Sequence, residues 1–422
     1  MGPVTGAPAD SSTPTIAGSE ISGATLTASP GTWSGYPSPS FTYDWQSCPE
    51  HSGNGCSSVQ SGASDQYALS STDEGLFLRV VVTASNGSGP DASATSAQTG
   101  VIQGSPANTA TPSISGTASA GETLTASPGT WSGYPAPSFT YDWQDCPDNS
   151  GDGCSTVQSG TSDQLTLSGS DAGSLVRVVV TASNLVGSDA TATSDFTDAV
   201  TRAPANTALP SISGTASAGD TLTASPGTWS GYPAPSLRYD WQDCPDNSGD
   251  GCSSVQSGAS NHFTLSGSDA GSLVRVVVTA TNGVGSDASA TSDFTDTVTQ
   301  APVNNAPPSI AGTASVGESL QASTGTWSGY PAPSFSYTWQ DCPDSSGENC
   351  STITGAVSSA YVLATTDEGS MVRVLVKAAN GVGPDVTAAS ATTAAVTGAP
   401  ADISLPAISG SATAGQPLTA SP

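Results

Sequence analysis

A seven-residue motif, Gly-Thr-Trp-Ser-Gly-Tyr-Pro, occurs four times in the chain, and each copy begins 98 residues after the one before. The copies begin at Gly31, Gly129, Gly227 and Gly325. Cys, Trp and Arg keep the same register in all four without an insertion or deletion. Only a folded unit has a packing reason to hold such a register, so the repeat outweighs a scarcity of large apolar residues that alone would indicate disorder.

The period sets the expected domain organisation. A unit of 98 residues is the size of one small β-sandwich and too small for a Rossmann or barrel enzyme. We expect the end of a preceding unit at 1–7, repeats at 8–105, 106–203, 204–301 and 302–399, and the start of a truncated fifth repeat at 400–422. The chain is thus expected to be a window of a longer array, whose neighbouring domains are its first expected partners.

The net charge of −28 reflects a deficit of basic residues, because the chain has 35 Asp and Glu but only 7 Lys and Arg. Such a chain cannot neutralise a row of phosphates, so no nucleic-acid partner is expected. No apolar run approaches the roughly 20 residues of a membrane helix, so no membrane span is expected in this segment. The N-terminal MGPVTGAP lacks the basic and apolar regions of a secretion signal, which is therefore expected outside this chain.

All eight cysteines occur in Cys-x7-Cys pairs, one pair in each repeat. The pairs are Cys48 with Cys56, Cys146 with Cys154, Cys244 with Cys252, and Cys342 with Cys350. An even count with one local pair per unit predicts four local disulfides and an extracellular or cell-surface location. Zinc is the alternative, but one Cys pair without a further Cys or His in the unit cannot complete a tetrahedral site.

The hydrophobic pattern of the second repeat predicts short strands and no helix. Residues 138–144 alternate, with Phe139, Tyr141 and Trp143 on one face, as in a half-buried strand. Strands are expected at 113–115, 123–126, 138–144, 164–167, 175–183 and 190–201. The last of these is expected to carry Phe196 and Val200.

The inward face of the strand at 175–183 is predicted from the fourth repeat. There one set of alternating positions contains Arg373 and Lys377, whereas the other set is entirely apolar. Because side chains alternate between the two faces of a strand, the apolar set belongs in the core. In the second repeat that set is Val176, Val178, Val180 and Ala182.

About seven short strands in 98 residues predict a Greek-key β-sandwich. The repeats resemble the bacterial, actinobacterial-type immunoglobulin-like (Ig-like) repeats found in tandem on secreted and cell-surface proteins. The resemblance is carried by Tyr141-Asp142-Trp143 and by Asp171-x-Gly173 leading into 177–184, RVVVTASN. The repeats lack the inter-sheet disulfide of antibody domains. They also lack the corner Tyr of those domains, and Leu175 lies near the position that this Tyr would occupy. The expected fold class is all-β, with four tandem Ig-like Greek-key β-sandwich domains in a linear rod plus a partial fifth unit.

The loop between the paired cysteines is the first candidate site. In repeats two and three it contains the pattern D-x-S-x-D-G, the first half of an oxygen-ligand calcium loop. The candidate calcium ligands are Asp148, Ser150, Asp152, Asp246, Ser248 and Asp250. The position of the bidentate Glu is Ser159 or Ser257, so the pattern is incomplete, and an acidic, disulfide-closed hairpin tip is the alternative.

The repeated aromatic turn is the second candidate site. Its rings could form a stacking platform for a polysaccharide or another cell-surface ligand, repeated along the chain to give avidity. They belong to Trp33 with Tyr36, Trp131 with Tyr134, Trp229 with Tyr232, and Trp327 with Tyr330. The alternative is that each Trp fills the end of a small core and each Tyr covers the turn prolines.

The polar residues offer little for catalysis. One Arg per repeat, Arg177 in the second, is expected to pair across strands with a nearby acid, and a polar contact to a ligand is the alternative. The two histidines, His51 and His262, lie at unrelated positions, so no repeated catalytic base or metal site is available. We therefore expect no enzyme, and no cofactor other than the calcium that the Cys-closed loops could bind.

Two functions are open to such a chain. One is a structural stalk, spacer or filament segment, with the proline-containing connectors, such as TRAPANTALPS at 201–211, limiting bending between domains. The other is an adhesin that binds polysaccharide or a host surface through the aromatic turns or the Cys-closed loops. Buried Trp side chains would argue against the aromatic turns as a binding site.

Overall fold

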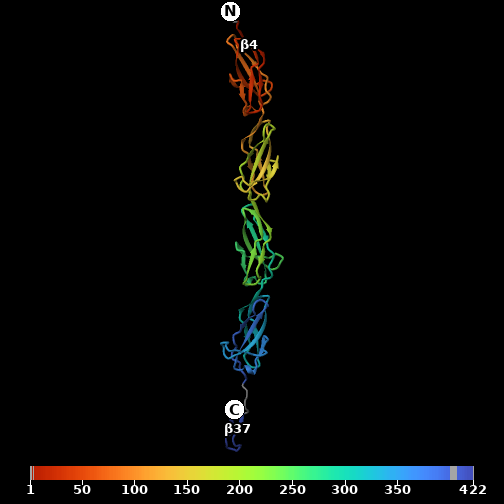
Figure 1. Ribbon diagram of the computed structural model, residues 1–422. Coiled ribbons are helices and arrows are strands. Elements are labelled where there is room, and N and C mark those ends of the chain that lie inside the picture. Colours follow the sequence, from red (N-terminus) through yellow and green to blue (C-terminus); the bar gives the residue numbers. More distant parts are fainter. Residues whose placement is uncertain (1, 3, 400–405, 422) are drawn as a thin grey trace. The chain divides into compact units, whose positions relative to one another are not determined.

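The computed structural model describes residues 2, 4–399 and 406–421. Residues 400–405, where the fifth repeat is expected to begin, lie outside this part. The chain forms two compact units, described here each by itself. One comprises 1–204, 230–235 and 282–286, and the other comprises 205–229, 236–281 and 287–422. Regular structure is almost entirely β-strand (Figure 1), and none of the described helices could cross a membrane.

Each repeat contains a three-stranded sheet, a four-stranded sheet and a two-stranded ribbon. The three-stranded sheets comprise β2 (Thr15–Ala17), β3 (Thr25–Ser29) and β7 (Gln66–Ala68); β11 (Ser113–Ser115), β12 (Thr123–Ser127) and β16 (Gln164–Thr166); β20 (Ser211–Ser213), β21 (Thr221–Ser225) and β25 (His262–Thr264); β29 (Ser309–Ala311), β30 (Ser319–Ser323) and β34 (Ala360–Val362).

The four-stranded sheets, in spatial order, comprise β6 (Ser57–Gly62), β5 (Ser40–Cys48), β8 (Phe77–Ser85) and β9 (Ala92–Thr95); β15 (Ser155–Gly160), β14 (Ser138–Cys146), β17 (Leu175–Ser183) and β18 (Ala190–Thr193); β24 (Ser253–Gly258), β23 (Ser236–Cys244), β26 (Leu273–Thr281) and β27 (Ala288–Thr291); β33 (Ser351–Thr352), β32 (Ser334–Cys342), β35 (Met371–Ala379) and β36 (Val386–Ala389).

The ribbons comprise β1 (Gly6–Ser12) with β4 (Thr32–Tyr36), β10 (Gly104–Ala110) with β13 (Thr130–Tyr134), β19 (Arg202–Ala208) with β22 (Thr228–Tyr232), and β28 (Gln300–Ala306) with β31 (Thr326–Tyr330). Short 3₁₀ turns precede strands β8, β26 and β35: η1 (Ser71–Asp73), η2 (Gly267–Asp269) and η3 (Thr365–Asp367).

This strand order confirms the predicted tandem Ig-like β-sandwiches. When the strands are lettered by their place in an Ig domain, the three-stranded sheet is A-B-E and the four-stranded sheet is C′-C-F-G. In the second repeat the core contains Trp143 and the inward face of β17, where Val176, Val178 and Val180 are fully buried as predicted. Trp143 therefore serves as the strand-C core residue that the pattern of 138–144 indicates.

The last predicted strand is shorter than expected. Strand β18 ends at Thr193, although 190–201 was the predicted range. Beyond it, the hydroxyls of Ser194 and Thr197 accept hydrogen bonds from the N–H groups of Val178 and Val176, both at 3.0 Å. Side-chain hydroxyls thus take the place of backbone acceptors, while the N–H groups of Ser194 and Thr197 still donate to the carbonyls of Val178 and Val176 at 2.9 Å. Val200 returns to the core as expected.

The connectors are strands rather than proline-stiffened linkers. The segment around Pro106 forms β10, which pairs with β13 and has a register shift between Gly104 and Ala107. A proline has no N–H to contribute to a ladder, and an edge strand with a bulge tolerates it. In the C-terminal fragment, β37 (Ala407–Ser409) pairs with β38 (Thr419–Ser421).

Candidate functional site

All four disulfides predicted from the cysteine spacing are present in the structure. They join Cys48 to Cys56, Cys146 to Cys154, Cys244 to Cys252, and Cys342 to Cys350. The Cα atoms of each pair are 4.1 Å apart, and the described part of the chain has no free cysteine. The pairing is therefore confirmed, and no thiolate pair is left for the alternative zinc site.

Each disulfide closes the loop of the hairpin between strands C and C′. The first cysteine of each pair, Cys48, Cys146, Cys244 or Cys342, is the last residue of strand C. The second cysteine, Cys56, Cys154, Cys252 or Cys350, directly precedes strand C′. The disulfide therefore holds the ends of two neighbouring strands together.

In the loop of the second repeat, the side-chain oxygens of Asp148 and Ser150 accept hydrogen bonds from the loop backbone. Asp148 Oδ1 accepts from the Ser150 N–H at 2.8 Å, and Ser150 Oγ accepts from the Asp152 N–H at 3.1 Å. These contacts with Ser150 hold the pKa of Asp148 below its usual range. The same two bonds link Asp246, Ser248 and Asp250 in the third repeat, at 2.8 and 3.1 Å.

In the described part of the chain, no group of three or more His, Cys, Asp or Glu side chains is placed to hold a metal ion. In each of the two loops, the candidate calcium ligands form two consecutive turns closed by hydrogen bonds. Calcium binding by these loops stays a prediction of the sequence pattern.

The repeated arginine does not pair with an acid, and that expectation was wrong. In the second repeat Arg177 Nε donates to Gln144 Oε1 at 2.8 Å, because the register of β14 and β17 places the two residues directly opposite each other. Its guanidinium also reaches the carbonyl of Gly151 in the disulfide loop at 3.4 Å and lies 5.5 Å from the centre of the Phe196 ring. The arginine therefore braces the loop against strand F.

The tryptophan of the aromatic turn packs on the core. In the second repeat Trp131 is half-buried against the core cluster, and its ring lies 6.0 Å from that of Phe139. Its Nε1 donates to the carbonyl of Pro128 at 2.7 Å, so the polar edge of the indole is already used. Trp33, Trp229 and Trp327 pack in the same way on their own cores.

The tyrosine of the same turn lies against the preceding repeat. A Cβ added to Gly75 would lie 3.1 Å from Cδ2 of Tyr134, so the ring covers the bare backbone of that glycine. Tyr134 is 39% exposed, whereas Tyr36, which has no preceding repeat in the structure, is 54% exposed. The contact recurs between Gly173 and Tyr232 and between Gly271 and Tyr330.

The two rings of each aromatic turn thus pack against different parts of the protein. Trp131 contacts the core of its own repeat, whereas Tyr134 contacts the turn before strand F of the previous one. Polysaccharide binding through these rings stays a prediction.

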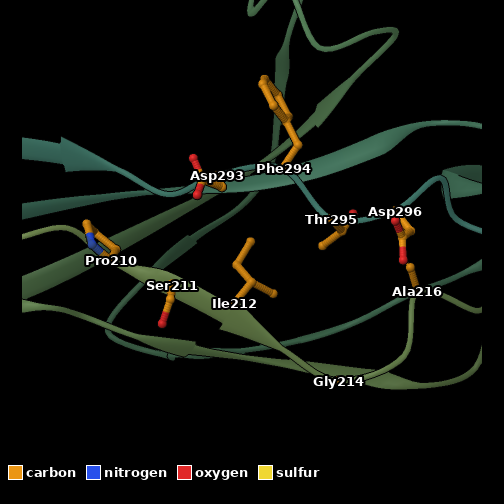
Figure 2. A pocket seen from close by; sticks show the side chains of 9 residues that line it. All are labelled: Pro210, Ser211, Ile212, Gly214, Ala216, Asp293, Phe294, Thr295 and Asp296. Carbon is orange, nitrogen blue, oxygen red and sulfur yellow. The ribbon is translucent and has the colours of Figure 1, made fainter.

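A groove of about 360 Å³ lies between β20 and the segment that follows β27 (Figure 2). Ile212 from the strand and Thr295 from the segment lie along it, with Asp293 and Asp296 toward its ends. Similar grooves occur beside β2 and β11. The groove is thus lined by the first strand of the three-stranded sheet and by the segment that follows the last strand of the four-stranded sheet.

A pair of carboxyl groups near the disulfide was not foreseen from the sequence. Asp145 Oδ1 is buried without a hydrogen-bond partner, and burial, followed by the neighbouring Asp171, raises the pKa of Asp145 to about 6. Asp171 in turn accepts from the Ser168 N–H at 2.5 Å. Burial and Asp269 raise the pKa of Asp243 to about 7 in the same way.

The same arrangement occurs in the fourth repeat but not in the first. Burial and Asp367 raise the pKa of Asp341 to about 6. In the first repeat the equivalent position is Ser47, which carries no carboxyl group. A tyrosine donates to the second aspartate in both repeats, Tyr67 to Asp73 at 2.9 Å and Tyr361 to Asp367 at 2.7 Å, so the difference lies at position 47. The sequence signal that could have located the pairs is the Asp at this position in three repeats and its replacement in one.

No protein-family model matches the chain, and no curated protein matches its sequence. Similar solved structures include a Ca²⁺-stabilized adhesin that helps an Antarctic bacterium reach out and bind ice. It is 17% identical, with a TM-score of 0.30, and the match covers 93% of this chain and 100% of that one.

Two further similar structures are also built of tandem domains. The tetra-tandem repeat in the extending region of a large adhesion protein is 15% identical, with a TM-score of 0.27 and coverage of 90% and 98%. Sidekick-1 immunoglobulin domains 1–4 are 18% identical, with a TM-score of 0.24 and coverage of 93% and 99%. At such scores the likeness carries no argument about function, and the Ig-like assignment depends on the strand order.

Proposed function

We propose that the chain is an extracellular spacer, a stalk or filament segment of tandem Ig-like domains that holds neighbouring repeats in fixed orientation. The observation that supports this is the hydrogen bonding of consecutive residues at the first junction. The Gln103 N–H donates to the Glu20 carbonyl at 2.8 Å, and the Gln103 carbonyl accepts from the Ser22 N–H at 2.7 Å. The carbonyl of the next residue, Gly104, accepts from Asn184 Nδ2 of the second repeat at 2.7 Å.

The other two junctions have the same bonds. At the second, the Thr201 N–H donates to the Ala118 carbonyl at 2.9 Å, and the Arg202 carbonyl accepts from Asn282 Nδ2 at 2.9 Å. At the third, the equivalent bonds join Thr299 to Ala216 at 2.9 Å and Gln300 to Asn380 at 2.8 Å. Consecutive residues are thus hydrogen-bonded to different repeats, which favours a stiff connection over a flexible linker.

Small-angle scattering of the full chain tests the proposal. At about 3.4 Å per strand residue, plus loops, each repeat spans roughly 40 Å, so four in line reach on the order of 160 Å. We expect a maximum dimension of this order for the native chain. The control variant carries Gly-Ser-Gly-Ser-Gly inserted after Gln103, Thr201 and Thr299. Each insertion separates the two consecutive residues that are hydrogen-bonded to different repeats.

The insertions are expected to broaden the distance distribution while leaving the circular dichroism spectrum unchanged. A compact native particle, or a native chain as flexible as the insertion variant, would contradict the proposal. The extracellular location is supported by the four disulfides, which persist in oxidising compartments. Its expected partners are neighbouring Ig-like domains of the same array.

A further inference from the structure

The turn before strand F meets one residue of the following connecting segment, which in the first three repeats is the first residue of β10, β19 or β28. The residue types on the two sides change together among the repeats. Where the connecting residue is Gly104 or Gly398, the turn carries Glu74 or Glu368. Where the connecting residue is the long Arg202 or Gln300, the turn carries alanine at that position and glycine three residues earlier. These are Ala172 with Gly169, and Ala270 with Gly267.

In the first arrangement the turn supplies the side chain. A Cβ added to Gly104 would overlap Oε1 and Cδ of Glu74, so the glutamate occupies the space of a side chain at 104. Glu74 is half-buried there and Gly104 is buried. Gly398 and Glu368 repeat the arrangement, since a Cβ on Gly398 would overlap the carboxylate of Glu368.

In the second arrangement the connecting strand supplies the side chain. Arg202 Nη1 donates to the Gly169 carbonyl at 3.1 Å, and a Cβ on Gly169 would lie 2.7 Å from Cζ of Arg202. Likewise, a Cβ on Gly267 would lie 2.5 Å from Nε2 of Gln300. The long polar side chain therefore lies on the bare backbone of the turn glycine.

We propose that these surfaces form a matched contact in which one long polar side chain, from either the turn or the connecting strand, fills the junction between repeats. Each turn then fits a connecting residue of its own class. A junction with a long side chain on both sides is overfilled, and one with none is left open to water. The inference rests on the proposed spacer function, because it assigns the residues that set the fit of neighbouring repeats.

The test converts the first junction of the full chain from the first arrangement to the second by substitution. Gly104→Gln alone places a glutamine, as in the third junction, against the existing Ser71 and Glu74. The matched variant adds Ser71→Gly and Glu74→Ala, which reproduces the turn of the second class. Glutamine is used because an arginine at 104 could pair with Glu74 and hide the misfit.

Hydrogen exchange at the Ser22 and Gln103 amides, which hold the junction, reports the outcome. The single variant is expected to exchange about two- to tenfold faster than the native chain, a coupling typical of residues in contact. The matched variant is expected to return to the native rate. Native exchange in the single variant, or no recovery in the matched variant, would overturn the inference.

The reciprocal substitutions, which convert a junction of the second arrangement to the first, provide a second, independent measurement. Gly267→Ser with Ala270→Glu, facing the uncharged Gln300, is expected to raise hydrogen exchange at the Thr299 amide, and the addition of Gln300→Gly is expected to restore protection. Scattering of the native chain separates the two proposals. A compact native particle with coupled exchange would remove only the spacer function, whereas an extended particle without coupling would remove only the matched junction.

Discussion

At the scale of single residues, the paired carboxyls are the groups most sensitive to their surroundings. Asp243 lies one position before a disulfide cysteine, with a buried oxygen that lacks a hydrogen-bond donor. It faces Asp269, which already accepts from the Ser266 N–H and hydroxyl at 2.6 and 2.8 Å. Two such carboxyl groups are most stable when they share one proton, because a second charge in the same site is repelled.

These pairs predict a stability that falls as the pH rises. Because the folded pKa values of about 6, 7 and 6 for Asp145, Asp243 and Asp341 exceed that of an unfolded aspartate, the stabilisation is complete below pH about 4. It is lost as the pH rises through 6 to 7. The Tm of the native chain, measured by calorimetry, is expected to decrease between pH 4 and pH 8.

Replacing the three aspartates by asparagine is expected to flatten that slope and raise the Tm at pH 8, since an amide can donate to the facing carboxylate at either pH. The matched control removes the same number of charges at exposed positions, with Asp91→Asn, Asp189→Asn and Asp287→Asn, and should retain the native slope. A native Tm that stays constant or rises over this range would count against the shared proton.

At the scale of elements, two interactions hold the tip of the C–C′ hairpin, a disulfide and an arginine contact. The disulfide between Cys244 and Cys252 joins the ends of the loop in the third repeat, and Arg275 of strand F contacts the carbonyl of Gly249 inside it at 3.4 Å. The same arginine also bonds to Gln242 of strand C at 2.8 Å. The loop therefore depends on the central strand pair of its own repeat.

Reduction of the disulfides is expected to lower the free energy of unfolding by about 2 to 3 kcal/mol per repeat, the loop-entropy value for a loop of roughly nine residues. Urea unfolding with and without a phosphine reductant measures it. The variant with both Cys146→Ser and Cys154→Ser should shift only the part of the transition that belongs to the second repeat. Unfolding curves that superimpose with and without reductant would rule out the stabilising role.

At the scale of the whole molecule, charge is nearly uncompensated. The net charge is −28, and among the described residues one ion pair is present, Lys377 Nζ with Asp385 Oδ2 at 2.7 Å. Both partners are substantially exposed, so this pair contributes little. Repulsion between like charges is therefore the main long-range electrostatic effect on the folded chain.

Salt is accordingly expected to stabilise the protein. Raising NaCl from about 10 mM to about 150 mM shortens the Debye length from roughly 30 to 8 Å and weakens the repulsion more than any attraction. The Tm should increase over this range. Lys377→Met should leave the increase intact, and a Tm that falls with added salt would show that attractive pairs dominate instead.

Local patterns predicted most of the strands and the core. The alternation of 138–144 and the apolar set Val176, Val178 and Val180 depend only on which side chains can face water, so they could be read from the sequence. The cysteine spacing likewise predicted the disulfides, because a short separation leaves one local partner. The length of the last strand was missed, since the hydroxyl of Thr197 replaces a backbone acceptor and no hydrophobic pattern records that.

By itself, the sequence determined the repeat, the sandwich strands and the closed loops, because each depends on residues close together in the chain or on burial alone. Only the tertiary structure decided what lies across from a residue distant in sequence. It gave Arg177 a glutamine instead of an acid, placed Tyr134 on Gly75, and set Asp145 beside Asp171. Those contacts depend on strand register and on how one repeat joins the next. The periodicity of the sequence shows that such contacts recur, but it does not show which residues make them.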